Sequence, residues 1–100
     1  MMEKVKLTAK ERSRREGRIN LLASEVPEIY RPAYKTLLRQ GGWLTHSSIK
    51  SGCNQSKQTG MMIAGLCRSG FITESSVVVN CGIGESYVAR AWKPVVGLDE

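Results

Sequence analysis

The stretch from Gly42 to Ile72 reads GWLTHSSIKSGCNQSKQTGMMIAGLCRSGFI and predicts the centre of the fold. Its apolar start at 43–45 is short enough for a small strand, and a short helix is predicted around 48–50. Residues 51–54 include Gly52, whose freedom at positive φ suits a tight turn. A second helix is predicted from about 55 to 69, and the glycine that follows ends it. The stretch therefore has the outline of two short helices joined by a tight turn.

Six consecutive polar residues open the second predicted helix: Asn54, Gln55, Ser56, Lys57, Gln58 and Thr59. Amide, hydroxyl and ammonium groups suit base edges and phosphates, so we interpret this helix as a DNA-reading element. Gln55, Ser56 and Gln58 are predicted to contact bases, since glutamine pairs well with adenine. Asn54 is expected to contact DNA beside these residues. On another face of the same helix, Thr59, Ile63 and Leu66 share a stripe and are expected to pack inward.

Basic residues give the chain a formal net charge of +6 and are concentrated in its first 70 residues. Residues 1–18 hold seven Lys or Arg against three Glu, residues 19–70 hold six against two Glu, and residues 71–100 hold two against four acidic residues. A polyanionic partner follows from this distribution, and a basic arm that only keeps the protein in solution is the alternative. The predicted phosphate contacts are Lys50, Lys57, Arg68, Arg12, Arg14, Arg15 and Arg18.

Two further helices are predicted before this pair. Thr8 and Glu11 have the spacing of a capping box, which predicts a helix from Ala9 to about Ser24. Its first half is nearly all charged, while apolar side chains recur at helical spacing in and after its second half: Ile19, Leu22 and Val26. That half is expected to pack on the body of the chain or on a second chain, and a solvated helix is the alternative.

The second of these helices follows Pro27, which ends the first one because the residue before a proline avoids the α region. Pro32 fits the first turn of the new helix. An apolar stripe along it is expected to join the core: Tyr30, Tyr34, Leu37 and Leu38.

After Gly70 the apolar period changes from 3.6 residues to two, which indicates β-structure. Residues 71–79 are rich in β-branched side chains and predict one strand, and residues 87–92 alternate strictly and predict a second. Two glycines and an asparagine within 80–86 predict a hairpin turn between them.

The spacing of the cysteines and the absence of enzyme motifs limit the classes of function that the sequence predicts. Cys53, Cys67 and Cys81 form no close pair, which favours reduced thiols and a cytoplasmic location, and no secretion signal or membrane-spanning run is seen. We therefore predict no metal and no cofactor, and a zinc or iron–sulfur site that also uses His46 is the alternative. No phosphate loop, H-E-x-x-H or paired-carboxylate motif is present, so an enzyme is not predicted.

The order of the predicted elements resembles the winged helix-turn-helix superfamily over residues 30–93. Five residues at the helix-to-strand junction carry the resemblance: Ile63, Leu66, Gly70, Phe71 and Ile72. The short strand at 43–45 and the turn at 80–86 also match the pattern. The resemblance implies that the second helix of the pair enters the major groove, which involves Asn54 to Gln58. It also implies that a wing around Asn80, Gly82 and Gly84 touches the backbone or minor groove. The tip departs from a basic wing, since it lacks Lys and Arg and carries Glu85.

The sequence thus predicts an α+β fold, a winged helix-turn-helix with a three-helix core, a C-terminal β-hairpin wing and an extra basic N-terminal helix. Residues 1–26 are expected to form a basic arm and dimer element, and 27–100 the winged domain. The expected function is sequence-specific binding of double-stranded DNA by a small transcriptional regulator, as a homodimer that uses 19–26. The alternative is a winged-helix protein–protein or RNA interaction module without sequence-specific DNA readout, in which a protein partner would bind through the hairpin or the N-terminal helix.

Overall fold

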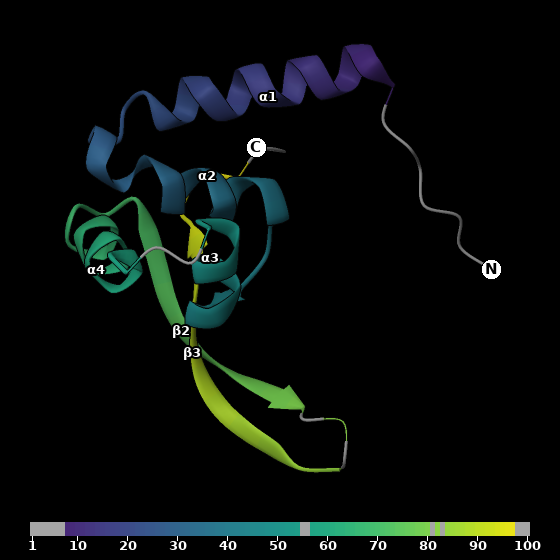
Figure 1. The fold of residues 1–100 in the computed structure, drawn as a ribbon, viewed down its shortest axis with the longest axis vertical. Helices are drawn as coiled ribbons and strands as arrows, with labels where there is room; N and C mark the ends of the chain where they lie inside the picture. The colour runs from purple at the N-terminus through teal and green to yellow at the C-terminus, as the bar shows by residue number, and fades with distance from the viewer. Residues whose placement is uncertain (1–7, 55–56, 81, 83, 98–100) are drawn as a thin grey trace.

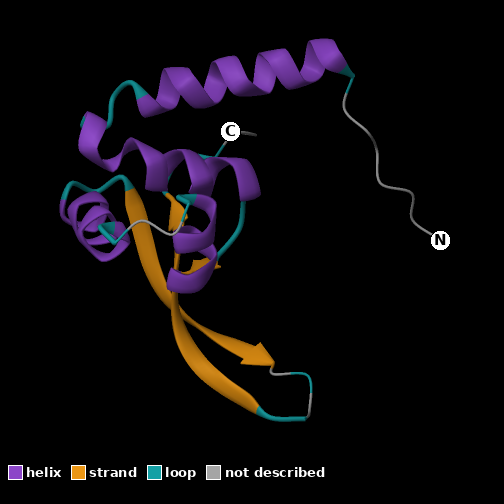
Figure 2. Ribbon diagram, viewed as in Figure 1, coloured by secondary structure: helices purple, strands orange, loops and turns teal. Residues whose placement is uncertain are grey.

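The computed structural model describes residues 8–54, 57–80, 82 and 84–97. Its helices gather into a compact body, and a long β-hairpin projects from that body (Figure 1; Figure 2 shows the same view by secondary structure). The layout is α+β and is compatible with the winged-helix arrangement expected from the sequence. In chain order the elements are α1 (Ala9–Ala23), the 3-10 helix η1 (Glu28–Tyr30), α2 (Arg31–Gln40), β1 (Leu44–Thr45), α3 (His46–Gly52), α4 (Thr59–Arg68), β2 (Ile72–Asn80) and β3 (Ser86–Pro94).

Helix α1 begins and ends with specific polar contacts. The Glu11 backbone N–H donates to Thr8 Oγ1 at 3.2 Å, which confirms the predicted N-cap. At the other end, Arg31 Nε donates to the carbonyl oxygens of Ala23 at 3.0 Å and Val26 at 2.9 Å. Carbonyls at the end of a helix lack the next turn of donors, so a guanidinium from the start of α2 supplies hydrogen bonds there.

The apolar half of α1 belongs to the core of its own chain. Ile19, Ala23 and Val26 are almost completely buried and share one hydrophobic cluster with Leu37 and Leu66 over the described residues. Of the two expected alternatives, the body of the chain or a second chain, these side chains pack on the body. The side chains that suggested a dimer element are therefore covered within the chain, whereas Leu21 on the same helix is 68% exposed.

Helix α2 lies between α1 and the α3–α4 pair (Figure 1). Pro32 stands in its first turn as predicted, and Tyr34, Leu37 and Leu38 are buried on its apolar stripe. The Tyr34 ring meets the Phe71 ring edge-on, with centroids 5.9 Å apart, which ties α2 to the segment after α4. That segment begins at Gly70, where φ is +79° and the predicted helix stop is confirmed.

Two glycines allow close packing between elements. A Cβ on Gly52 would overlap the Thr36 side chain, and a Cβ on Gly65 would overlap the Tyr30 ring. Gly52 lies at the end of α3, and the positive φ expected there falls instead on Asn54, at 57°. Asparagine tolerates this conformation better than most residues, so it can make the turn in place of glycine.

The described strands form an antiparallel sheet in the order β1-β3-β2. Leu44 pairs with Trp92 and Ile72 pairs with Pro94, so the buried end of the sheet lies against the helices. Strand β2 is displaced by one residue from the predicted 71–79, and β3 is longer than the predicted 87–92, so the two strands reach Asn80 and Ser86 at the far end. Among the described residues, no helix combines the length and apolar character that crossing a membrane requires.

Candidate nucleic-acid interface

Helix α4 begins at Thr59, so the prediction that it begins near residue 55 is wrong. Thr59 is 1% exposed and anchors the first turn in the core, whereas Lys57 and Gln58 before it are exposed. Asparagine and serine side chains also compete with helix formation by bonding to nearby backbone. Asn54, Lys57 and Gln58 accordingly lie in the turn before the helix, and Gln55 and Ser56 lie outside the described residues.

The buried and exposed faces of α4 separate cleanly. Its inward face holds Thr59, Ile63 and Leu66 as predicted, together with Met62 and Gly65. Its outward face holds Gly60, Met61, Ala64 and Arg68, and these four residues together with Lys57 in the preceding turn are here called the α4 strip. The prediction of base contacts did not include Gly60 and Ala64. Both residues could have been assigned to the outward face from the sequence, because the inward face was already assigned to other positions of the same helix. Asn54 and Gln58, which were expected to lie on this face, instead precede it in the turn.

The segment of the chain that contains the α4 strip carries charge of one sign. No Asp or Glu occurs between Glu28 and Glu74, and the same interval holds six Lys or Arg residues. The basic residues of this interval differ in whether they contact other residues of the chain. Arg31 caps α1, and Arg39 pairs with Glu16, so these two are engaged within the chain. Across the described residues, no hydrogen-bond or ion-pair partner is found for three others, all of which are exposed: Lys50, Lys57 and Arg68.

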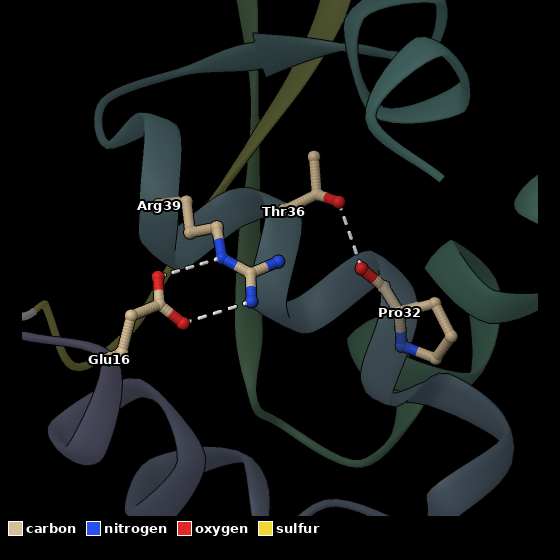
Figure 3. A network of polar contacts seen from close by, with 4 residues as sticks. All are labelled: Glu16, Pro32, Thr36 and Arg39. Carbon is tan, nitrogen blue, oxygen red and sulfur yellow. Dashed lines mark hydrogen bonds and ion pairs between the residues drawn. The ribbon is translucent and has the colours of Figure 1, made fainter. Parts of the chain in front are cut away.

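The pair between Glu16 and Arg39 fixes α1 to the end of α2 (Figure 3). Arg39 Nε donates to Glu16 Oε1 at 3.2 Å and Arg39 Nη2 donates to Glu16 Oε2 at 3.1 Å. The hydrogen bond from Arg39 holds the pKa of Glu16 below its usual value of 4.5. Arg15 Nη2 donates to the Arg39 carbonyl oxygen at 3.0 Å, which adds a second contact at the C-terminal end of α2.

The structure does not bring the predicted basic residues together. Arg12, Arg14, Arg15 and Arg18 are exposed on α1, and α2 separates that helix from α4. Of these, Arg15 contacts Arg39 and Arg18 has a contact elsewhere in the chain. The predicted phosphate contacts therefore form two groups, one on α1 and one spread over α3 (Lys50), the turn before α4 (Lys57) and α4 (Arg68).

The far end of the hairpin carries none of this positive charge. Asn80 ends β2 opposite Ser86 and is exposed, and Gly82 and Gly84 have φ of 73° and 77°. The segment 75–89 contains no Lys or Arg. Large apolar side chains are exposed along it: Val78 is 68% exposed, its cross-strand partner Val88 is 70% exposed, and Tyr87 is 52% exposed.

The two described cysteines, Cys53 and Cys67, are not joined by a disulfide. Cys53 and Cys67 are free and half-buried, and Cys81 lies outside the described residues. Burial and the nearby Glu74 carboxylate raise the pKa of Cys67, which keeps its thiol protonated. Over the part of the chain that the structure describes, no three His, Cys, Asp or Glu side chains are grouped as metal ligands.

A scan against protein-family models, a search of curated proteins and a search of solved structures each found no match to this chain. The features of the chain that point to a function are the geometry of α4, the basic residues of its segment and the hairpin.

Proposed function

We propose that this protein binds double-stranded DNA in a sequence-specific manner and acts as a small transcriptional regulator. The observation that supports this most is the α4 strip, because it is exposed within a long acid-free interval and its cations have no partner among the described residues. An α-helix fits the major groove of B-DNA, and cations at its ends can reach the phosphates on either side. On this proposal the fold is a winged helix-turn-helix, with α3 and α4 as the helix pair and β2–β3 as the wing.

Each group of residues then has a distinct role. Lys50, Lys57 and Arg68 bind phosphates near α4 and supply the salt-dependent part of the affinity. The turn before α4 contacts base edges through Asn54 and Gln58, and the predicted readers Gln55 and Ser56 contact bases as well. The α1 group, Arg12, Arg14, Arg15 and Arg18, binds phosphates at a different stretch of the duplex, since α2 separates it from α4. Asn80 contacts the DNA backbone from the wing.

A homodimer in the cytoplasm completes the proposal. One small module buries limited area on DNA, so two copies on a two-fold site would give the affinity and spacing that regulators use. Because Ile19, Ala23 and Val26 are covered within the chain, a contact through α1 would have to use outward residues such as Leu21. The protein is proposed to be a binding protein and not an enzyme.

The test is the affinity for a random-sequence duplex, measured by fluorescence anisotropy over a series of salt concentrations. We expect a steep decrease with salt, and the variant Lys57→Gln should reduce the slope of log affinity against log salt by about 0.9, the value for one lost phosphate contact. The matched control is Lys93→Gln, which removes the same charge from the sheet next to Trp43. A flat salt response, or equal slopes in the two variants, would contradict the proposal.

The hairpin favours a second candidate, a protein–protein interaction module. Val78, Tyr87 and Val88 expose apolar surface on a projecting element without cations, which is a feature of protein contact sites. The same salt series separates the two candidates, because this module has no reason to bind duplexes with a steep salt dependence.

A further inference from the structure

We infer that α4 recognises thymine methyl groups in the major groove, and this inference rests on the proposed DNA binding. Between the cations Lys57 and Arg68, the α4 strip presents Gly60, Met61 and Ala64. None of these three residues has a side-chain hydrogen-bond donor or strong acceptor. This part of α4 can therefore distinguish bases only by apolar contact and by exclusion.

The major groove offers one apolar group for such contact. Thymine presents its C5-methyl group there, while guanine, cytosine and adenine are read by polar groups along their edges. An apolar side chain placed over those polar edges removes water without replacing its hydrogen bonds, which is unfavourable. Base pairs under Met61 and Ala64 should accordingly be A·T pairs, favoured by methyl burial and by the penalty at G·C pairs.

The dimensions of the strip limit how many base pairs it can read in this way. Gly60 and Ala64 are four residues apart, which is about 6 Å along an α-helix. Base pairs are spaced by about 3.4 Å, so this part of α4 covers about two of them. Gly60 permits close approach of the backbone because it has no side chain, and a Cβ added there would lie 3.8 Å from His46 Nε2, an ordinary contact distance.

Met61 suits the contact because its side chain is adaptable. It is 41% exposed, and its flexible thioether can settle against a methyl group whose exact position varies with DNA shape. Lys57 and Arg68 lie at the two ends of the strip, and both are free among the described residues to hold phosphates on either side. The unbroken positive sign of the segment between Glu28 and Glu74 supports DNA as the occupant of this helix face.

The experiment replaces thymine by deoxyuracil in duplexes selected from a random pool by the unaltered 100-residue chain. This exchange removes only the methyl group and keeps the hydrogen-bonding pattern. At one or two positions we expect a loss of about fourfold in affinity each, which corresponds to about 0.8 kcal/mol for one buried methyl group. Met61→Ala should weaken binding to the thymine duplex and abolish the difference between thymine and uracil at one of these positions.

A control variant and three contrary outcomes keep the inference separate from the proposed function. Met61→Leu retains an apolar side chain of similar size and should retain the discrimination, and thermal melting should show that both variants fold because Met61 is on the surface. Tight, salt-dependent binding with no uracil effect at any position would overturn the methyl inference and leave the proposed DNA binding intact. Discrimination that is unchanged in both Met61→Ala and Ala64→Gly would also overturn it. Failure to bind any duplex would overturn the proposed function and the inference with it.

Discussion

The α4 strip and the outer half of the hairpin, residues 75–89, both expose apolar side chains, yet their surroundings differ. The strip is backed by the core through Leu66 and Ile63 and has cations at both ends. The outer hairpin has no helix behind it in Figure 1, and its own segment holds Glu85 and no cation. Exposed apolar surface alone therefore does not specify a partner, because the charge around it decides which partners are attracted.

The two regions also differ in how they pack against the body of the protein. Along β3, Ala91 and Trp92 are buried against the body, whereas Tyr87 and Val88 extend beyond it. The indole N–H of Trp92 donates to Glu74 Oε2 at 3.1 Å, which secures the base of the hairpin to β2. Beyond that point, the described hairpin depends mainly on its own cross-strand pairs, so its outer half should open more readily than α4.

The largest expected effect compares a buried residue of α4 with an exposed residue of the hairpin. Leu66→Ala removes a side chain that is completely buried and should lower the free energy of unfolding by about 2–5 kcal/mol. Val88→Ala removes exposed surface and should change it by less than about 0.5 kcal/mol. Urea unfolding followed by circular dichroism measures both. Similar losses in the two variants would show that the outer hairpin is packed against something other than solvent.

Two glycine-to-alanine substitutions on α4 should change the stability of the protein in opposite directions. Gly65→Ala places a Cβ against the Tyr30 ring and should destabilise the protein by about 1–3 kcal/mol. Gly60→Ala makes only an ordinary contact with His46 and should stabilise it by about 0.5 kcal/mol. If α4 enters the groove, Gly60→Ala should weaken duplex binding in spite of that gain. Thermal melting and anisotropy on the same samples would reveal both effects, and tighter binding by Gly60→Ala would argue against close approach at this position.

A lysine added to the hairpin tests whether it comes near the duplex. Asn80→Lys should strengthen duplex binding and steepen the salt slope by about 0.9 if the tip approaches phosphates. The control Leu21→Lys adds the same charge to an outward position on α1. If the two variants change the slope equally, the hairpin has no special position relative to the DNA, and its apolar surface is better explained by a protein partner.

The smallest expected effect concerns the contact that holds α1 to α2. Because the folded pKa of Glu16 is lowered, its pair with Arg39 adds stability above pH 4.5 that is lost as the pH falls through the lowered pKa. Glu16→Gln should therefore melt slightly below the unaltered protein at pH 7, and the difference should disappear well below pH 4.5. Melting curves at the two pH values test this, and an equal difference at both would mean that the carboxylate charge is not responsible.

Local signals in the sequence determined most of the element types. Thr8 and Glu11 predicted the start of α1, Pro32 predicted the start of α2, and Gly70 predicted the end of α4, since each acts through contacts within a few residues along the chain. The change of period after Gly70 likewise predicted the hairpin, because side chains on a strand alternate between two faces. The inward face of α4 followed from the same kind of local periodicity.

Tertiary structure alone decided where α4 begins and which of the described cations are engaged. Six polar residues in a row are compatible with a helix or a turn, and burial of Thr59 in the core fixes the first turn of the helix there. Arg39 is engaged because Glu16, 23 residues earlier, lies beside it, and Gly65 is required because the Tyr30 ring lies on it. Contacts of this kind depend on how whole elements pack, which short-range periodicity does not specify, so the difference between engaged and unpartnered cations among the described residues became visible only in the folded chain.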